Sequence, residues 1–142
     1  ETLVSEAAIL REAEKIIQHN PAGMLAQTMK NADAKPIERV FMAARQGDES
    51  VRRMLRERGE FLGLALVNVV NLFNPELILL GGIFSQGKEF FLEPAIHTVR
   101  KMSFGGMGEK VRIQPTSFGW KAGVVGAAAL ALMNFFYQVE TT

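Results

Sequence analysis

Residues 59–84 read GEFLGLALVNVVNLFNPELILLGGIF, and this stretch of sequence decides the fold. Its first half predicts a long helix, because apolar residues recur at steps of three and four, as one buried helical face requires. These residues are Leu55, Leu62, Leu66, Val69, Val70 and Phe73. Pro75 lacks the amide donor of a continuing helix and forces Asn74 out of the α region, so the helix must end there.

A short aliphatic run and two glycines follow this helix. Residues 77–80 have the length and composition of a strand that is buried on both faces, as in a layered α/β domain. Gly81 and Gly82 come directly after it, and their missing side chains allow a tight turn with accessible amides. Ligands of open α/β sheets bind beyond the carboxyl ends of the strands, so the sequence predicts a binding site at this turn.

The rest of the chain predicts a mostly helical organisation with one further strand. Ser5 and Asp48 are expected N-caps, Pro36 suits a first helical turn, and Gly47 suits a helix end. The expected helices cover residues 5–18, 24–29, 36–45, 48–73, 89–101 and 121–137, the second strand covers 111–115, and 104–108 is expected to be a loop.

Composition sets the class of protein. The chain has 142 residues, of which 48% are hydrophobic and 22% charged, so one domain or one lobe of a larger protein is expected. A net charge of +1 gives no electrostatic basis for nucleic-acid binding by this chain. The absence of cysteines excludes a disulfide framework or a thiolate metal site within it, and fits the cytoplasmic location that we expect.

Two apolar segments, residues 61–73 and 122–133, are too short for membrane spans and are predicted to be buried core helices, so we expect no membrane contact. In the second segment Gly123, Ala127 and Ala131 form a stripe of small residues at four-residue spacing. Such a stripe lets another backbone approach closely. An alternative interpretation is that this helix forms one wall of a nucleotide or sugar cleft.

Other polar residues give no assembled site. His19 and His97 have no neighbouring ligand pattern, so we expect structural or surface roles for both. The arginines near the middle of the chain alternate with acidic residues at helical spacing, which is typical of a solvated, salt-bridged face. They are Arg45, Arg52, Arg53, Arg56 and Arg58. The sequence therefore indicates no catalytic residues and no metal ligands.

Four segments together resemble a known family. ETLVSEAAIL, AARQGDESVRRML, LGLALVNVVNLFNPELILLGGIFSQG and FGWKAGVVGAAALAL follow in the order and spacing of the carboxyl-terminal half of ROK proteins, which are repressors, open reading frames and sugar kinases. The resemblance implies an α/β fold, helix-rich with a small sheet, that forms the second lobe of an actin/hexokinase-like, ribonuclease-H-type architecture. Residues 1–142 would be a single carboxyl-terminal lobe, a fragment of a two-lobed protein.

The resemblance also implies sites. Glu1 matches the glutamate that contacts sugar in the family, and Gly81-Gly82 match a turn that lies against the adenosine part of ATP in the kinases, which in a repressor would be a relic. A zinc site of one histidine and three cysteines, the magnesium–ATP machinery of the kinases and the helix-turn-helix of the repressors would lie upstream. This chain alone is expected to hold no cofactor and to show no kinase activity.

Two functions follow from the resemblance. The first is the effector-sensing and oligomerisation part of a sugar-responsive transcriptional repressor of the xylose or N-acetylglucosamine type, a homo-oligomer that contacts DNA only through a missing N-terminal domain. The alternative is the carboxyl-terminal half of an ATP-dependent, glucokinase-like sugar kinase. Val4-Ser5-Glu6 favours the repressor, because kinases of the family often carry Ala-Ser-Gly at this place. A sugar-binding protein with neither role stays open.

Overall fold

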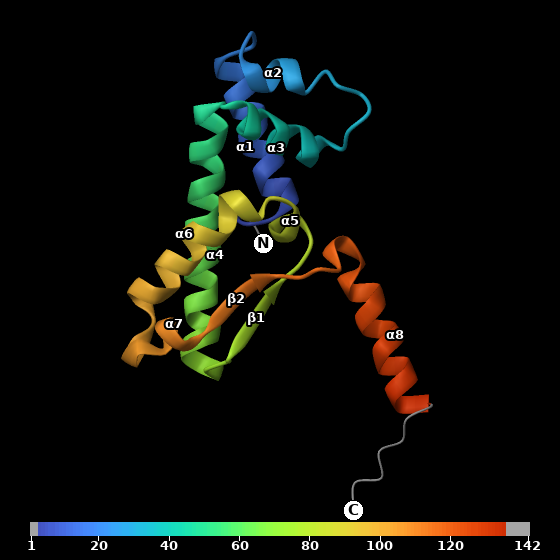
Figure 1. Cartoon of the computed structure of the whole chain (residues 1–142). Helices are drawn as coiled ribbons and strands as arrows, with labels where there is room; N and C mark the ends of the chain where they lie inside the picture. Colours follow the sequence, from blue (N-terminus) through green and yellow to red (C-terminus); the bar gives the residue numbers. More distant parts are fainter. Residues whose placement is uncertain (1–2, 136–142) are drawn as a thin grey trace, which may run out of the picture.

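The computed structural model describes residues 3–135, which form a helix-rich α/β structure with a small parallel sheet. In Figure 1 the long helix α4 runs through the structure, α1–α3 gather near its start, and the sheet lies near its end. The elements are α1 (Glu6–His19), α2 (Met24–Thr28), α3 (Pro36–Gln46), α4 (Glu49–Phe73), β1 (Leu77–Leu80), α5 (Ile83–Gln86), α6 (Lys88–Met102), η1 (Phe104–Gly106), α7 (Met107–Lys110), β2 (Arg112–Pro115), η2 (Gly119–Lys121) and α8 (Ala122–Phe135).

Most helix boundaries confirm the capping predictions. The Ser5 hydroxyl accepts a hydrogen bond from the Ala8 amide at 3.2 Å, and Gly47 closes α3 with a φ of 105°. Asn74, before Pro75, has a φ of 43° and ends α4 in the left-handed region. The loop expected at 104–108 is wrong, because this segment forms η1 and the start of α7.

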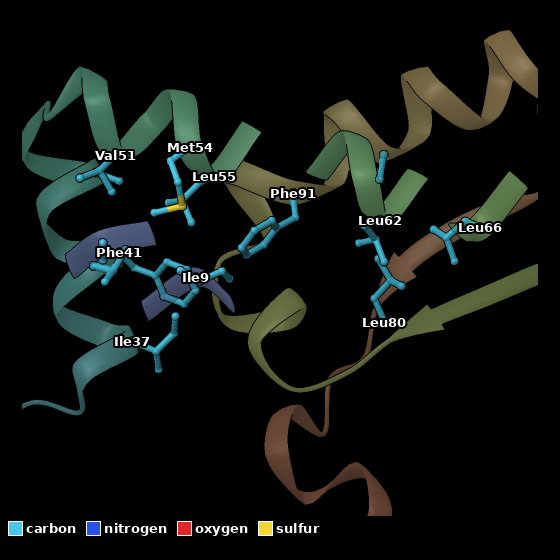
Figure 2. Packing of buried hydrophobic residues seen from close by; sticks show 14 of the residues in the cluster. Ile9, Ile37, Phe41, Val51, Met54, Leu55, Leu62, Leu66, Leu80 and Phe91 are labelled. Atoms are coloured by element: carbon cyan, nitrogen blue, oxygen red, sulfur yellow. The ribbon is translucent and has the colours of Figure 1, made fainter. Parts of the chain in front are cut away.

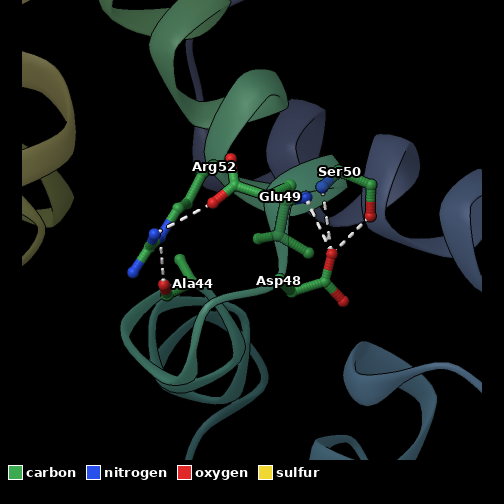
Figure 3. Close-up of polar contacts among 6 residues, drawn as sticks. Ala44, Asp48, Glu49, Ser50 and Arg52 are labelled. Atoms are coloured by element: carbon green, nitrogen blue, oxygen red, sulfur yellow. Dashed lines mark hydrogen bonds and ion pairs between the residues drawn. The ribbon is translucent and has the colours of Figure 1, made fainter.

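Asp48 joins three helices at the start of α4. Its carboxylate accepts hydrogen bonds from the Ser50 amide at 3.1 Å and the Val51 amide at 3.2 Å, and also from the Ser50 hydroxyl. Its second oxygen accepts from the Leu25 amide of α2 at 3.1 Å. Figure 3 shows the cap beside Arg52, whose Nε donates to the Ala44 carbonyl of α3 at 2.7 Å.

Helices α4 and α6 approach each other closely because glycines face the contact. A Cβ atom at Gly63 would lie 2.6 Å from Thr98 Cβ and 2.9 Å from the Ala95 carbonyl oxygen. At Gly59 it would lie 3.1 Å from Pro94 Cβ. Pro94 lies inside α6, so it removes one amide donor from the helix at the turn that faces Gly59.

The hydrophobic core follows α4 along one side. Figure 2 shows Phe41 and Phe91 between the first three helices and α6, and Leu62, Leu66 and Leu80 farther along, where α4 meets the sheet. The buried face of α4 was predicted to reach Phe73. This prediction is wrong for the carboxyl end of the helix. Val69 is 38% exposed and Phe73 is 71% exposed, because the pattern continues beyond the elements that cover it.

The two strands pair in parallel, with Leu77 opposite Arg112 and Leu80 opposite Pro115. Leu80 and Ile113 belong to the core, whereas Leu77 and Leu79 are 40% and 60% exposed. Burial of β1 on both faces is therefore wrong for the described residues. Side chains alternate between the two faces of a strand, and helices cover only one face of this sheet.

Helix α8 leads away from the remaining elements (Figure 1). The expectation of a buried helix over 122–133 is wrong, since Val124 is 68% exposed and Leu130 is 62% exposed. Nothing in the described part of the chain lies within 4 Å of a Cβ built at Gly123 or Gly126, so the small-residue stripe meets no second backbone there. Within residues 3–135, no helix is long and apolar enough to cross a membrane.

The packing of α4 on α6 predicts opposite effects for two glycine-to-alanine substitutions. Gly63→Ala forces a methyl group against Thr98 and should lower the free energy of unfolding by about 1–3 kcal/mol. Gly126→Ala adds the same methyl group in open space on α8 and should raise it by up to about 1 kcal/mol. Urea unfolding followed by circular dichroism measures both. Equal effects of the two substitutions would contradict this account of the helix contact.

The Asp48 cap predicts a pH-dependent stability. Burial alone would raise the pKa of Asp48, but the hydrogen bonds from Ser50, Val51 and Leu25 outweigh it and lower the pKa below 3.8. The stabilisation is thus fully present above the unfolded pKa and is lost as pH falls through the folded pKa. Asp48→Ala should lower the free energy of unfolding by about 1–2 kcal/mol near neutral pH.

The measurement is urea unfolding of Asp48→Ala beside the unaltered chain, at about pH 7 and about pH 3. The difference between the two proteins should shrink at the lower pH. A difference that stays constant between the two pH values would show that the charge of Asp48 does not contribute.

Candidate functional site

The carboxyl ends of β1 and β2 lie at one edge of the sheet, because the strands are parallel and in register. The turn at Gly81-Gly82 follows β1, and the segment that begins at Thr116 follows β2. The Thr116 amide donates to the Leu80 carbonyl at 2.8 Å, so the ladder extends one bond beyond the strands. The two post-strand segments therefore start side by side, at the edge where ligands of open α/β sheets bind.

Glycine geometry makes this edge accessible. Gly82 has a φ of +60°, and nothing lies within 4 Å of a Cβ built there. Gly81 lies in ordinary contact distance of its neighbours, since its Cβ would be 3.7 Å from Thr116 Cγ2 and 4.0 Å from Ala122 Cβ. Gly119 has a φ of +54° and faces Ser85 Oγ, 3.9 Å from its Cβ position. The edge thus has open space at Gly82 and only ordinary contacts at Gly81 and Gly119, and all three glycines are half-buried.

Sequence reasoning identified Gly81 and Gly82 but missed the residues that the fold brings to them. Thr116, Gly119 and Ala122 belong to the segment between β2 and the start of α8. The second strand predicted from the sequence could have led to these residues. In a parallel pair, the residues after both strands share one edge, so the sequence that follows 111–115 belonged to the same candidate site.

Glu1, the predicted sugar ligand, lies outside the described residues. The segment after it is described from Leu3, whose carbonyl oxygen accepts a hydrogen bond from Arg58 Nη1 at 3.2 Å. Ser5 then caps α1. The first described residues are therefore tied to α1 and α4.

The predicted solvated arginine face is confirmed in part. Arg45 and Arg52 form exposed ion pairs with Glu89 and Glu49 at 2.6 and 3.0 Å. Arg58 contradicts the prediction, because it is only 8% exposed. The approach of α1 buries it.

Glu12 of α1 lies beside Arg58. Its Oε1 is 3.6 Å from Arg58 Nη2 and 2.8 Å from Lys15 Nζ. The hydrogen bond from Lys15 lowers the pKa of Glu12, burial opposes this, and the charges of Lys15, Arg58 and Arg11 lower it further. Glu12 therefore carries a negative charge that partly balances the buried guanidinium.

The two histidines lie on the surface. His19 ends α1 with its Nδ1 at 2.7 Å from the Lys15 carbonyl oxygen. His97 lies on α6 at a groove of about 730 Å³, which charged side chains of both signs line together with Leu92, Ile96 and Pro115. The described residues contain no group of three or more His, Cys, Asp or Glu side chains that could hold a metal ion.

Sequence comparison finds relatives of two kinds. The xylose repressor of Caldicellulosiruptor bescii is 27% identical over 134 residues, covering 94% of this chain and 33% of the repressor. A glucokinase of Thermotoga maritima is 31% identical over 134 residues, covering 92% of this chain and 41% of the kinase. The chain thus spans between a third and two fifths of the length of these relatives.

Solved structures give the same division. A ROK family glucokinase from Streptomyces griseus in complex with glucose and AMPPNP superposes with a TM-score of 0.73 at 29% identity, covering 92% of this chain and 43% of that one. A ROK family transcriptional regulator, a homologue of the Escherichia coli Mlc protein, gives 0.69 at 29% identity, covering 80% and 28%. The ROK family model matches residues 1–134, and the chain belongs to the ROK family.

Proposed function

We propose that this chain is the effector-sensing and oligomerisation part of a sugar-responsive transcriptional repressor. The observation that carries the proposal is the segment Val4-Ser5-Glu6, which departs from the Ala-Ser-Gly pattern of many kinases in the family. Here Ser5 caps α1 with its side chain and Glu6 begins the first turn. An acidic residue in the first turn stabilises the helix, so the segment after Glu1 is anchored to α1.

Exposed apolar surface supports a role as one lobe of a larger, self-associating protein of actin/hexokinase-like architecture. Leu79 on the open face of the sheet is 60% exposed, and Leu130 and Phe135 on α8 are 62% and 80% exposed. Large apolar surfaces of this kind mark contact sites. The proposed occupants are the first lobe of the same protein and a second subunit. DNA contact belongs to neither surface, because the chain carries a net charge of only +1.

The alternative function is the carboxyl-terminal half of an ATP-dependent sugar kinase. It is favoured by the glycine turn, because backbone without side chains at Gly81-Gly82 permits a nucleotide to approach. The described residues leave room for a nucleotide at Gly82, because nothing lies within 4 Å of a Cβ built there. A Cβ at Gly81 would make only ordinary van der Waals contacts. The glucokinase from Streptomyces griseus was solved with AMPPNP, a nucleotide.

A gel-shift series on the complete gene product distinguishes the two functions. The repressor function predicts binding to its own promoter and a change in that binding with one of D-xylose, D-glucose and N-acetylglucosamine. A coupled assay for sugar-dependent ATP turnover runs in parallel. If the protein phosphorylates a sugar at ordinary enzyme rates and binds no operator, the repressor proposal is wrong and the kinase function takes its place.

The proposed sugar contact of Glu1 is tested by Glu1→Ala in the complete gene product. A carboxylate accepts strong, charge-assisted hydrogen bonds from sugar hydroxyls, so its loss should weaken sugar binding by more than about tenfold in calorimetric titration. Glu14→Ala, an exposed glutamate of α1, is the matched control and should leave binding unchanged. Equal dissociation constants for Glu1→Ala and the unaltered protein would remove Glu1 from the site.

A further inference from the structure

The two strands differ in how well they suit the edge of a sheet. The sheet of the described residues has two strands, so β1 and β2 each leave one edge unpaired there. β2 exposes Arg112 and Gln114 and ends at Pro115, and charge and proline are features that protect an edge from further pairing. β1 consists of residues 77–80, which are all aliphatic, with neither charge nor proline. By these rules β2 is a natural edge strand and β1 is not.

The backbone of β1 directs hydrogen-bonding groups to its unpaired edge. The Arg112 amide donates to the Glu76 carbonyl at 2.9 Å, so Glu76 faces β2 with its carbonyl. Backbone groups of successive strand residues point to opposite sides, so the amides and carbonyls of Leu77 and Leu79 point away from β2. An aliphatic strand with such a row of unpaired groups is a template for a further strand.

The side of α4 that faces away from α6 is apolar as well. Gly63 faces α6, and Leu72 comes nine residues later, about two and a half helical turns, so it lies on the opposite side of α4. Leu72 is 75% exposed, and Val69 is exposed near it. Every exposed residue of α4 up to residue 60 is charged, whereas residues 61–73 contain no charged side chain. The second half of α4 therefore has an exposed flank without the charges of a solvated face.

The unpaired edge of β1 and this flank of α4 lie on the same side of the structure. β2 lies beside α6, because Pro115 lines one groove together with Leu92 and Ile96 of α6. β1 lies on the other side of β2 (Figure 1). Its unpaired edge therefore faces away from α6, as Leu72 does. A strand added to β1 would continue the sheet toward the uncovered flank of α4.

We propose that the unpaired edge of β1 binds a further strand, and that a part of the same gene product outside residues 1–142 supplies this strand and covers Val69 and Leu72. The chain spans only between a third and two fifths of the length of its relatives, so a protein of their size has the additional polypeptide. The side chains of this strand that face α4 should be aliphatic, because they would contact an apolar flank.

The missing edge protection favours the same gene product over a second subunit as the source of the strand. A strand of the same polypeptide covers the edge whenever the protein is folded. A second subunit would leave an unprotected aliphatic edge open in every dissociated subunit, which invites aggregation. This proposal goes beyond the repressor and kinase functions and holds for either.

Amide hydrogen exchange of the complete gene product, resolved to single residues, tests the pairing. If a strand pairs with β1, the Leu77 and Leu79 amides should exchange within about tenfold of the Arg112 amide, which is bonded inside the sheet. Exchange of Leu77 and Leu79 that is faster than this would overturn the proposal.

Two substitutions of Leu79 separate strand pairing from simple burial. Leu79→Pro and Leu79→Ala both remove the leucine side chain, but only proline removes the amide donor. Proline is tolerated where the amide of an edge strand faces solvent. In the complete gene product, Leu79→Pro should therefore melt at least about 5 °C below Leu79→Ala, or fail to fold where Leu79→Ala folds. Equal melting temperatures would overturn the pairing.

Cysteine labelling tests the flank of α4, and the chain has no cysteine of its own to interfere. In the complete gene product, Leu72→Cys should react with a maleimide at least about tenfold more slowly than Arg53→Cys, followed by mass spectrometry of the two peptides. Arg53, exposed on the first half of the same helix, is the matched control. Equal rates would overturn the covering of this flank.

Dilution distinguishes the source of the strand. A strand of the same gene product protects the Leu77 and Leu79 amides equally at every protein concentration. Protection that disappears as the protein dissociates into monomers, measured by analytical ultracentrifugation, would place a second subunit at the edge and overturn the proposal. These tests involve neither sugar nor DNA, so their outcome is independent of the proposed function.

Discussion

The close approach of α4 and α6 is the constraint on which the other elements depend. It exists because Gly59 and Gly63 present no side chain to α6, where a methyl group at Gly63 would meet Thr98. Beyond α6 the chain reverses through α7 with a second close contact, since a Cβ at Gly108 would overlap the Val99 carbonyl. This compact reversal brings β2 beside β1. Separated helices would take β2 out of register and pull the two strand-end turns apart.

An exposed apolar surface on α8 begins near the carboxyl ends of β1 and β2. α8 starts at the strand-end edge, where Ala122 lies within contact distance of the Gly81 Cβ position, and then runs outward with exposed side chains such as Val124. Whatever packs on the first turns of α8 therefore also approaches the glycine turn. Contacts made by the start of α8 and access to the candidate site are therefore geometrically linked.

Local signals predicted the secondary structure, because caps and breakers act within a few residues. Ser5, Asp48 and Pro75 mark helix ends whatever packs around them. Burial depends on partners elsewhere in the chain, so the exposure of Phe73 and Leu79 could not be read from the pattern.

Arg58 was misread although a signal existed. It lies three residues after Leu55 and four before Leu62, so it falls on the apolar face of α4 while its neighbours do not. For the candidate site, the glycine turn was predictable from β1. The residues that join it required the pairing of β1 with β2, which is a long-range contact.

Helix α4 contacts both the first described segment and the strand that precedes the glycine turn. Arg58 holds the segment after Glu1, and Leu62 and Leu66, farther along the same buried side, pack in the core with Leu80, the residue before the glycine turn. The helical rise places residues 58 and 66 about 12 Å apart along the axis. A well-packed helix moves as a rigid body, because its core contacts are not continuously deformable. A displacement of α4 at its contact with the first segment must therefore also shift its contact with β1. The segment that begins at Leu3 and the strand-end turn are thus both attached to one rigid helix, which the glycine-mediated contact with α6 holds in place.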